Sequence, residues 1–420
     1  MNPPALLELT TELLHRVLQF KQPADGIVSD FFREHRTLGQ RERHTLAETT
    51  YAVLRQRPLL LHLAQSGRGE IERRLAILGW QGGNDAFLRA ALVDAEPAWL
   101  ARVAAIDRAG LPDKLRHNLP DWLADRLQDE LGDEFWPLVE SLNRPAPLDL
   151  RVNAFKAKRD DVQAALLAEG VEAKPTPYSP LGLRIEGKPA LHKLVTFLSG
   201  DVEVQDEGSQ LLALLLDAKR GEMVVDFCAG AGGKTLALGA SMRNTGRLYA
   251  FDTSGHRLAA LKPRLARSGL SNVYPAQIAH ERDDRIKRLA GKIDRVLVDA
   301  PCSGLGTLRR NPDLKWRQSP QSIDEMRLKQ AAILASAARL VKPGGRLVYA
   351  TCSLLRAENE DIAEAFEAEA GERFDRLPAA DALARAHVEQ PQSLVRGNDL
   401  RLWPHRHATD GFFAAVWQRR

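Results

Sequence analysis

The chain has 420 residues, 59 basic and 55 acidic side chains, and a formal net charge of +4. Its length is enough for about two or three domains, each with a core of its own. A hydrophobic fraction of 44% beside a charged fraction of 27% is typical of soluble globular proteins. No apolar run approaches the roughly 18 residues that a membrane span requires. The mild net charge alone does not distinguish nucleic acid from other partners.

Cysteine is scarce, with only Cys228, Cys302 and Cys352 in the chain. An odd and sparse set is not a disulfide framework, so we expect a reducing cytoplasm. The N-terminal stretch lacks a basic region and carries Glu8 and Glu12. It therefore predicts an amphipathic helix rather than a signal peptide. We expect a cytoplasmic protein with no membrane partner.

Residues 1–142 contain no convincing strand. Apolar residues recur there at helical spacing, as in Leu13, Leu14 and Val17. We expect an all-helical domain over these residues. Its arginine-rich stretch, 33–57, can form a basic face, although an ordinary solvated helix surface accounts for the charges equally well.

Residues 143–200 predict a small α+β segment. Pro145 and Pro147 are typical of a linker, because proline stiffens the chain and removes a hydrogen-bond donor. After them, 148–153 and 181–186 alternate like strands, and 160–170 has the apolar spacing of a helix.

From residue 201 to 420, strand and helix patterns alternate. The predicted strands are 223–227, 247–251, 295–298 and 347–350, and the clearest helix is 323–341. Such alternation indicates an α/β fold, with a mostly parallel sheet covered by helices on both faces.

A glycine-rich loop follows the first of these strands. Its residues are Cys228, Ala229, Gly230, Ala231, Gly232, Gly233 and Lys234. Such a turn before a helix lets backbone amides approach a ligand closely. A P-loop would need glycine at Cys228, and a dinucleotide site would need it at Thr235. S-adenosylmethionine is the remaining candidate, with Asp252 at the next strand end for its ribose, although an acid there also suits a dinucleotide.

Two further strands end beside a cysteine, at Cys302 and Cys352. Because ligands bind at the carboxyl ends of parallel strands, both thiols should lie on the rim that carries the glycine loop. A lone cysteine is usually a packing residue, and we interpret the Cys228 side chain in that way. No cluster of His and Cys completes a metal site, so we expect no metal.

Two thiols at one rim suit methylation of cytosine at C5. Addition of a thiolate to C6 makes C5 nucleophilic, and a base must then remove the C5 proton so that the sulfur can leave. Asp299 precedes Cys302 and can assist at N3 and the exocyclic amine. Lys234 can stabilise charge or lower a thiol pKa, although a lysine at a helix start can also simply face solvent.

The sequence resembles the Nop/Sun family of RNA cytosine-5 methyltransferases, most closely its bacterial ribosomal RNA branch. The resemblance covers nearly the whole chain. It rests on the glycine loop, on the paired Pro-Cys and Thr-Cys motifs at 299–304 and 350–353, and on residues 151–153, 204–206, 309–316, 404–406 and 410–413.

The resemblance implies a class I, Rossmann-like S-adenosylmethionine-dependent methyltransferase over 201–420. Its target would be C5 of a cytidine in RNA, expected to be 16S ribosomal RNA. Cys352 would be the nucleophile, and Cys302 would help to release the product. The resemblance also implies a NusB-like RNA-binding domain over 1–142 and an RRM-like segment over 143–200.

Two departures from the family pattern concern the cofactor. Ala231 stands where many relatives have proline. At Ala279–His280 the family usually has Gly-Asp, whose acid contacts adenosine, so we consider His280 or Asp283 as a substitute. We include Arg257 among the cofactor-binding candidates.

A basic stretch follows the Pro-Cys motif and contains Arg309, Arg310, Lys315 and Arg317 around Trp316. Basic residues there can hold RNA phosphates while the target base rotates into the pocket. The alternative is a basic surface loop whose Trp316 packs into a core. For the tryptophan alone, we prefer this alternative. Three other functions stay open: a non-catalytic RNA-binding assembly factor, a tRNA methyltransferase and a P-loop NTPase. We expect a monomer.

Overall fold

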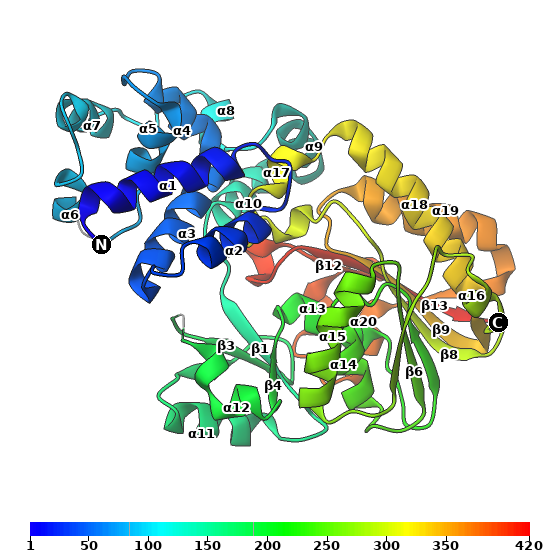
Figure 1. Ribbon diagram of the computed structural model, residues 1–420. Coiled ribbons are helices and arrows are strands. Elements are labelled where there is room, and N and C mark those ends of the chain that lie inside the picture. Colours follow the sequence, from blue (N-terminus) through cyan, green and yellow to red (C-terminus); the bar gives the residue numbers. More distant parts are fainter. Residues whose placement is uncertain (84, 188) are drawn as a thin grey trace. The chain divides into compact units, whose positions relative to one another are not determined.

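The computed structural model describes residues 1–83, 85–187 and 189–420. The chain forms two compact units (Figure 1). One comprises residues 1–145 together with 307–320, and the other comprises 146–306 together with 321–420. The predicted boundary at 142 lies close to this division, but the segment 307–320 does not belong with its sequence neighbours. No helix in the described part of the chain is long and apolar enough to cross a membrane.

The first unit is helical, as predicted. Its first helix begins at Pro3 because the Asn2 side chain accepts a hydrogen bond from the Ala5 backbone at 2.9 Å and caps the first turn. Leu7, Leu13 and Leu14 of that helix are fully buried in the core. The helices are α1 (Pro3–Val17), α2 (Ala24–Glu34), α3 (Gln40–Arg55), α4 (Arg57–Ala64), α5 (Ile71–Leu78), α6 (Asp85–Arg89), α7 (Glu96–Ala104), α8 (Asp113–Arg116), α9 (Asp121–Leu131), α10 (Phe135–Leu142) and α17 (Leu314–Arg317).

The second unit begins with a small antiparallel sheet in the order β2-β3-β1-β4. Its strands are β1 (Leu148–Val152), β2 (Ala173–Pro175), β3 (Gly182–Ile185) and β4 (Val202–Val204), and its helices are α11 (Arg159–Ala168) and α12 (Val195–Leu198). Alternate residues of β1, Leu150 and Val152, are buried against Leu166 of α11. This packing explains the strand and helix patterns of the predicted α+β segment.

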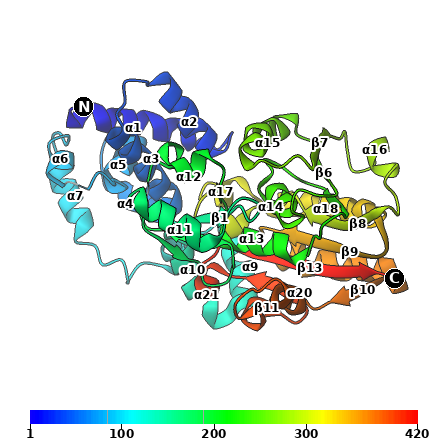
Figure 2. The ribbon, with the colours of Figure 1, turned by 90° about the horizontal axis from the view of Figure 1, so that it is seen from below.

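The large sheet of this unit has nine strands in the described part of the chain, in the order β11-β12-β13-β9-β8-β5-β6-β7, with β10 beside β13. The strands from β9 to β7 are parallel, whereas β13 is antiparallel to β9. Figure 2 shows β7, β6, β8, β9 and β13 following one another across this sheet. The strands are β5 (Met223–Asp226), β6 (Arg247–Asp252), β7 (Val273–Gln277), β8 (Ile293–Asp299), β9 (Val341–Thr351), β10 (Phe374–Leu377), β11 (Val395–Arg396), β12 (Asp399–Leu402) and β13 (Phe412–Arg419).

Helices cover both faces of this sheet. Neighbouring residues of β5 enter different cores: Val224 packs with residues of α13, α14 and α20, and Val225 packs with residues of α18 and α19. The helices are α13 (Glu207–Leu215), α14 (Gly233–Ser241), α15 (Gly255–Ser268), α16 (Asp284–Lys287), α18 (Pro320–Ala338), α19 (Glu360–Ala370), α20 (Ala379–Arg385) and α21 (Pro404–His407). The predicted α/β fold with a mostly parallel sheet is confirmed.

Strand order determines where a ligand can bind. The chain runs from β5 outward to β6 and β7, and then returns to the other side of β5 as β8 and β9. The order therefore reverses between β5 and β8, and crevices form at the carboxyl ends of the strands at such a point.

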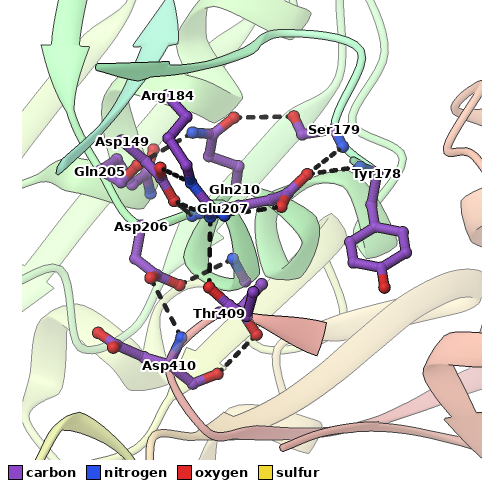
Figure 3. A network of polar contacts seen from close by, with 12 residues as sticks. Asp149, Tyr178, Ser179, Arg184, Gln205, Asp206, Glu207, Gln210, Thr409 and Asp410 are labelled. Carbon is purple, nitrogen blue, oxygen red and sulfur yellow. Dashed lines mark hydrogen bonds and ion pairs between the residues drawn. The ribbon is translucent and has the colours of Figure 1, made fainter. Parts of the chain in front are cut away.

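A buried polar network joins the small sheet to the start of α13 (Figure 3). Asp149 of β1 accepts a hydrogen bond of 2.7 Å from Arg184 of β3. Glu207 at the start of α13 accepts the backbone N–H groups of Tyr178 and Ser179 at 2.6 and 2.7 Å. Charge-assisted bonds of this kind fix α13 against the small sheet within one unit.

Candidate active site

The glycine loop joins β5 to α14. Gly230 and Gly232 have positive φ angles of 55° and 84°, which residues with a side chain rarely adopt. At Gly232 a Cβ atom would also lie 2.1 Å from Cδ1 of Leu261. The end of β6 holds the loop, because Ala229 donates to the Phe251 carbonyl and Gly230 donates to Oδ2 of Asp252, both at 2.8 Å.

Two carboxylates border this loop. Asp252 is 8% exposed, and its two oxygens accept backbone hydrogen bonds from Gly230 and Ser254. Asp226 is 1% exposed and accepts a 2.6 Å bond from the Thr235 hydroxyl through Oδ2. Its Oδ1 is buried without a hydrogen-bond partner among the described residues, and burial raises the pKa of Asp226 to about 7. A loop of glycines beside an unsatisfied polar atom fits a polar organic cofactor.

Lys234 and Asp299 form an ion pair between the start of α14 and the end of β8. The Lys234 Nζ lies 2.6 Å from Oδ2 of Asp299. Burial opposes the charge on Lys234, but Asp299 outweighs it and raises the pKa of the lysine. Lys234 therefore does not simply face solvent, and its ammonium stays charged beside the candidate acid.

The structure brings two of the three cysteines together. The Sγ atoms of Cys302 and Cys352 lie 3.3 Å apart, and both residues are partly buried. Their strands, β8 and β9, are parallel neighbours in which Asp299 pairs with Ala350. The hydrogen bond with Cys352, together with burial, raises the pKa of the Cys302 thiol well above its ordinary value. Cys302 therefore retains its proton at neutral pH.

Cys228 is a loop residue with a packing side chain. It is partly buried and contacts the core that α18 and α19 share with the sheet. Burial raises the pKa of its thiol well above the ordinary value. These facts agree with the interpretation of Cys228 as a core residue whose backbone shapes the loop.

The adenosine-side candidates are on exposed segments. His280 is exposed, and its Nδ1 accepts a 3.1 Å bond from the Arg282 backbone. The Asp283 carboxylate accepts bonds of 3.0 and 2.9 Å from the backbone of Ala279 and Arg285, which lower its pKa. Arg257 is exposed on α15. A cofactor contact by any of these residues stays a prediction.

Two of the four predicted RNA-binding residues are not available on the surface. Arg309 and Lys315 are only 5% and 2% exposed, since the segment 307–320 packs into the helical unit. Lys315 donates a 2.7 Å bond to the Arg55 carbonyl, and burial lowers its pKa to about 7. Arg55 in turn donates to the Arg309 carbonyl at 3.1 Å. Both side chains are therefore buried in this structure, and their contact with RNA phosphates stays a prediction.

The other residues of the segment 307–320 also include both packed and partly exposed side chains. Trp316 donates from its indole to the Leu54 carbonyl at 2.9 Å and packs on the core of the helical unit, as expected from the sequence. Arg317 is partly exposed and lies 3.3 Å from Asp313. Arg310 is partly exposed as well, so RNA contacts by these two arginines remain predictions.

Two known protein families match this chain. Residues 213–418 match the family described as 16S rRNA methyltransferase RsmB/F, and residues 119–192 match the RsmF/B-like ferredoxin-like domain. The chain therefore resembles the RsmB/F family over residues 119–192 and 213–418. The resemblance inferred from the paired cysteine motifs is thus confirmed.

Relatives of this family are similar over most of the chain. A probable ribosomal RNA small subunit methyltransferase B from Synechocystis is 37% identical over 71% of this chain. A protein of the same description from Bacillus subtilis is 33% identical over 72%. Each match spans 66% of the relative's own length.

Solved structures agree with the RsmB/F fold. The crystal structure of PH0851 has a TM-score of 0.79 and 28% identity, and the match covers 100% of this chain and 99% of that one. A methyltransferase homolog from Pyrococcus horikoshii has a TM-score of 0.62 and 29% identity over 75% of this chain and 100% of its own. The Rossmann-like methyltransferase fold of the second unit is therefore shown.

Two buried polar residues near the strand ends, Asp226 and Glu358, could not be identified as part of the site from the sequence. Asp226 is visible there only as the last residue of a strand, and nothing in the sequence indicates that one oxygen is unsatisfied. Glu358 follows Cys352 by six positions in a polar run, 358–361, that resembles a solvated helix start. In the structure Glu358 has no exposed surface.

Proposed function

We propose that the protein transfers a methyl group from S-adenosylmethionine to C5 of a cytidine in RNA, and that the RNA is 16S ribosomal RNA. The observation that supports this most is the pair of thiols, Cys302 and Cys352, 3.3 Å apart at neighbouring strand ends. A methyltransferase of carbon needs a way to activate its target, and covalent catalysis by a thiol provides one.

S-adenosylmethionine supplies an electrophilic methyl group when it is bound. The backbone of 228–233 would cradle its methionine portion at the start of α14. Asp252 would accept hydrogen bonds from the ribose, since each carboxylate oxygen can accept more than the one bond seen here. The buried Oδ1 of Asp226 lies at the end of β5, where the glycine loop begins, and has no donor among the described residues.

The two thiols would have different roles. The Cys352 thiolate adds to C6 of the cytosine, and the ring electrons make C5 the nucleophile that accepts the methyl group. A base then takes the C5 proton with the assistance of Cys302, the electrons of that C–H bond re-form the C5–C6 double bond, and the C6–sulfur bond breaks to return the Cys352 thiolate.

Asp299 and Lys234 would prepare the base for attack. A carboxyl group at N3 and the exocyclic amine stabilises the ring as the thiolate adds. The Lys234 ammonium, 2.6 Å from that carboxyl group, orients it and offsets charge that develops on the ring.

The test uses purified protein, labelled S-adenosylmethionine and 16S ribosomal RNA from cells that lack the modification. C352A should incorporate no label, because no covalent bond to C6 can form. C302A should instead accumulate a protein–RNA adduct that survives denaturing electrophoresis. Absence of label with the unaltered protein would contradict methylation, and an adduct in C352A would reverse the two roles.

The RNA class is tested separately. Bisulfite sequencing of ribosomal and transfer RNA from a deletion strain should show a cytidine that loses protection in 16S ribosomal RNA. Loss of protection confined to transfer RNA would mean that transfer RNA is the substrate, and the proposed chemistry would still hold. An RNA-binding assembly factor without catalysis predicts no lost site in either RNA.

A further inference from the structure

Glu358 lies fully buried in the short helix Arg356–Glu358, directly after β9 and the Cys352 loop. Each catalytic cysteine is followed by a serine, and both serines donate to this one carboxylate. Ser303 donates from its backbone N–H at 2.8 Å and from its hydroxyl at 2.5 Å. The Ser353 hydroxyl donates to the same oxygen as the Ser303 hydroxyl, Oε2.

Helix α18 also contacts the Glu358 carboxylate. Gln330 of α18 donates from Nε2 to Oε1 of Glu358 at 3.0 Å and to the Pro301 carbonyl at 2.9 Å. The main chain of Glu358 is held as well, because the Tyr349 hydroxyl of β9 donates to its carbonyl at 2.7 Å. The carboxylate thus connects β8, β9 and α18 at the point where the two thiols meet.

We propose that Glu358 is a positioning residue for the two thiols: its carboxylate holds the Cys302 and Cys352 loops in register and places a negative charge beside Cys302. As a statement about catalysis, this inference rests on the function proposed above. The bonds themselves do not depend on it.

The chemistry of the donors explains why a carboxylate is needed. Two hydroxyls, one backbone N–H and one amide N–H converge on the group, and only an ionised carboxyl group can accept from all of them. Glutamine at this position would direct an NH₂ group at some of these donors. A serine hydroxyl can rotate to adapt, whereas the backbone N–H of Ser303 cannot, so the Cys302 loop should move.

The charge has a second effect. The hydrogen bond with Cys352 and burial are the larger reasons for the raised pKa of Cys302, and the Glu358 carboxylate raises it further. Replacing the carboxylate by a neutral amide should therefore lower the pKa of Cys302. A merely structural role for Glu358 predicts no such change.

The first experiment needs neither RNA nor cofactor. In a C352A background, alkylation of Cys302 by iodoacetamide is followed against pH by peptide mass spectrometry, with Cys228 as an internal reference. E358Q should move the midpoint for Cys302 to lower pH and leave Cys228 unchanged. An unmoved midpoint in a folded protein overturns the electrostatic part of the proposal, whatever the substrate proves to be.

E207Q is the matched control. Glu207 is also fully buried, in the network of Figure 3, and accepts two backbone N–H groups, but neither donor adjoins a cysteine. We expect E207Q to lower thermal stability as E358Q does and to leave the Cys302 midpoint unchanged. An equal shift in both variants would mean that any buried charge, rather than Glu358, affects the thiol.

The second experiment measures turnover with both cysteines present. E358Q should lower kcat by about 100-fold, the order expected for displacement of a reacting group by about 1 Å, and leave KM for RNA nearly unchanged. E207Q should retain turnover. Normal turnover in E358Q overturns the positioning role, whereas inactivity of the unaltered protein points to failure of the proposed function instead.

S353A provides a test if E358Q does not fold. It removes one hydroxyl donor and keeps the carboxylate and its charge. We expect kcat to fall by about 10-fold, as for the loss of one orienting bond, with the Cys302 midpoint unchanged. A shifted Cys302 midpoint without a loss of turnover in S353A would contradict the proposal that the charge of Glu358 sets the pKa of Cys302 while its hydrogen bonds position the loops.

Discussion

The Asp226 carboxyl group lies at the end of β5 with almost no contact with solvent. Burial raises its pKa to about 7, and the Thr235 hydroxyl bond only partly opposes this. In the unfolded chain an aspartate has a pKa of about 4. Between these pH values the folded protein holds a proton that the unfolded chain has released, so stability should fall as pH rises through this window.

We therefore predict that D226N removes a pH dependence. Relative to D226N, the unaltered protein should lose roughly 4 kcal/mol of unfolding free energy between pH 4 and pH 8, as an upper bound for one buried group. Denaturant unfolding at several pH values measures the difference. D160N, at a carboxyl group with 90% exposed side chain, is the control and should show no such trend. A constant difference for D226N would contradict the raised pKa.

The glycine loop is the element with the strictest backbone requirement. Gly230 and Gly232 both have positive φ, but a Cβ atom at Gly230 would meet none of the described residues within 4 Å, whereas one at Gly232 would overlap the buried Leu261. The two positions therefore separate backbone strain from steric overlap.

G230A should cost about 1–2 kcal/mol of stability, from the left-handed conformation alone. G232A should cost more, about 2–4 kcal/mol, because Leu261 must also shift. Chemical denaturation measures both variants, and calorimetry with S-adenosylmethionine measures binding. Equal losses of stability would mean that Leu261 moves without resistance. Unchanged cofactor affinity in both variants would argue against the loop as the binding site.

Strand β9 shows how an element can differ from its local sequence. The sequence predicts a strand over 347–350, since Pro343-Gly344-Gly345 is a typical break. The strand instead begins at Val341, and Gly344 accommodates a φ of 75°. Pairing with β8 continues across an irregularity near Ile293 and Arg295. Tertiary pairing thus outweighs the local preference for a turn.

Across the chain as a whole, the segment 307–320 leaves the unit of the large sheet after Gly306 and becomes part of the helical unit. Trp316 contacts the core of that unit, and the Arg57 guanidinium lies 5.5 Å from its ring. Asp313 accepts a 3.2 Å bond from the backbone at the start of α2. The helical unit is therefore incomplete without a segment from the C-terminal half of the chain.

W316A tests this dependence. Truncation of a fully buried tryptophan costs about 3–5 kcal/mol, and for this partly exposed ring we expect about 2–4 kcal/mol. Hydrogen exchange should accelerate in α3 and in 307–320 together, with β5 and β6 unchanged. W122A, at another partly exposed tryptophan of the unit, should leave 307–320 protected. Unchanged exchange in 307–320 after W316A would contradict the shared core.

The class of fold and the proximity of the two thiols follow from the amino-acid sequence alone. Strand and helix periods are local, and the carboxyl ends of parallel strands share one rim, so the positions of Cys302 and Cys352 after two such strands are enough to place them together. The glycine loop is predictable for the same reason. Its exact contacts, such as the bond from Gly230 to Asp252, depend on the neighbouring strand.

Which charges are buried, in contrast, depends on the tertiary fold. Lys315 and Glu358 both look like surface residues in the sequence, because charge runs usually face solvent. Lys315 is covered by helices that lie far before it in the sequence. Its side-chain nitrogen donates to the carbonyl of Arg55, which is 260 residues away along the chain. Glu358 is enclosed by loops that meet only when β8 pairs with β9. Burial depends on contacts between distant segments, and a single sequence records residue order but not those contacts.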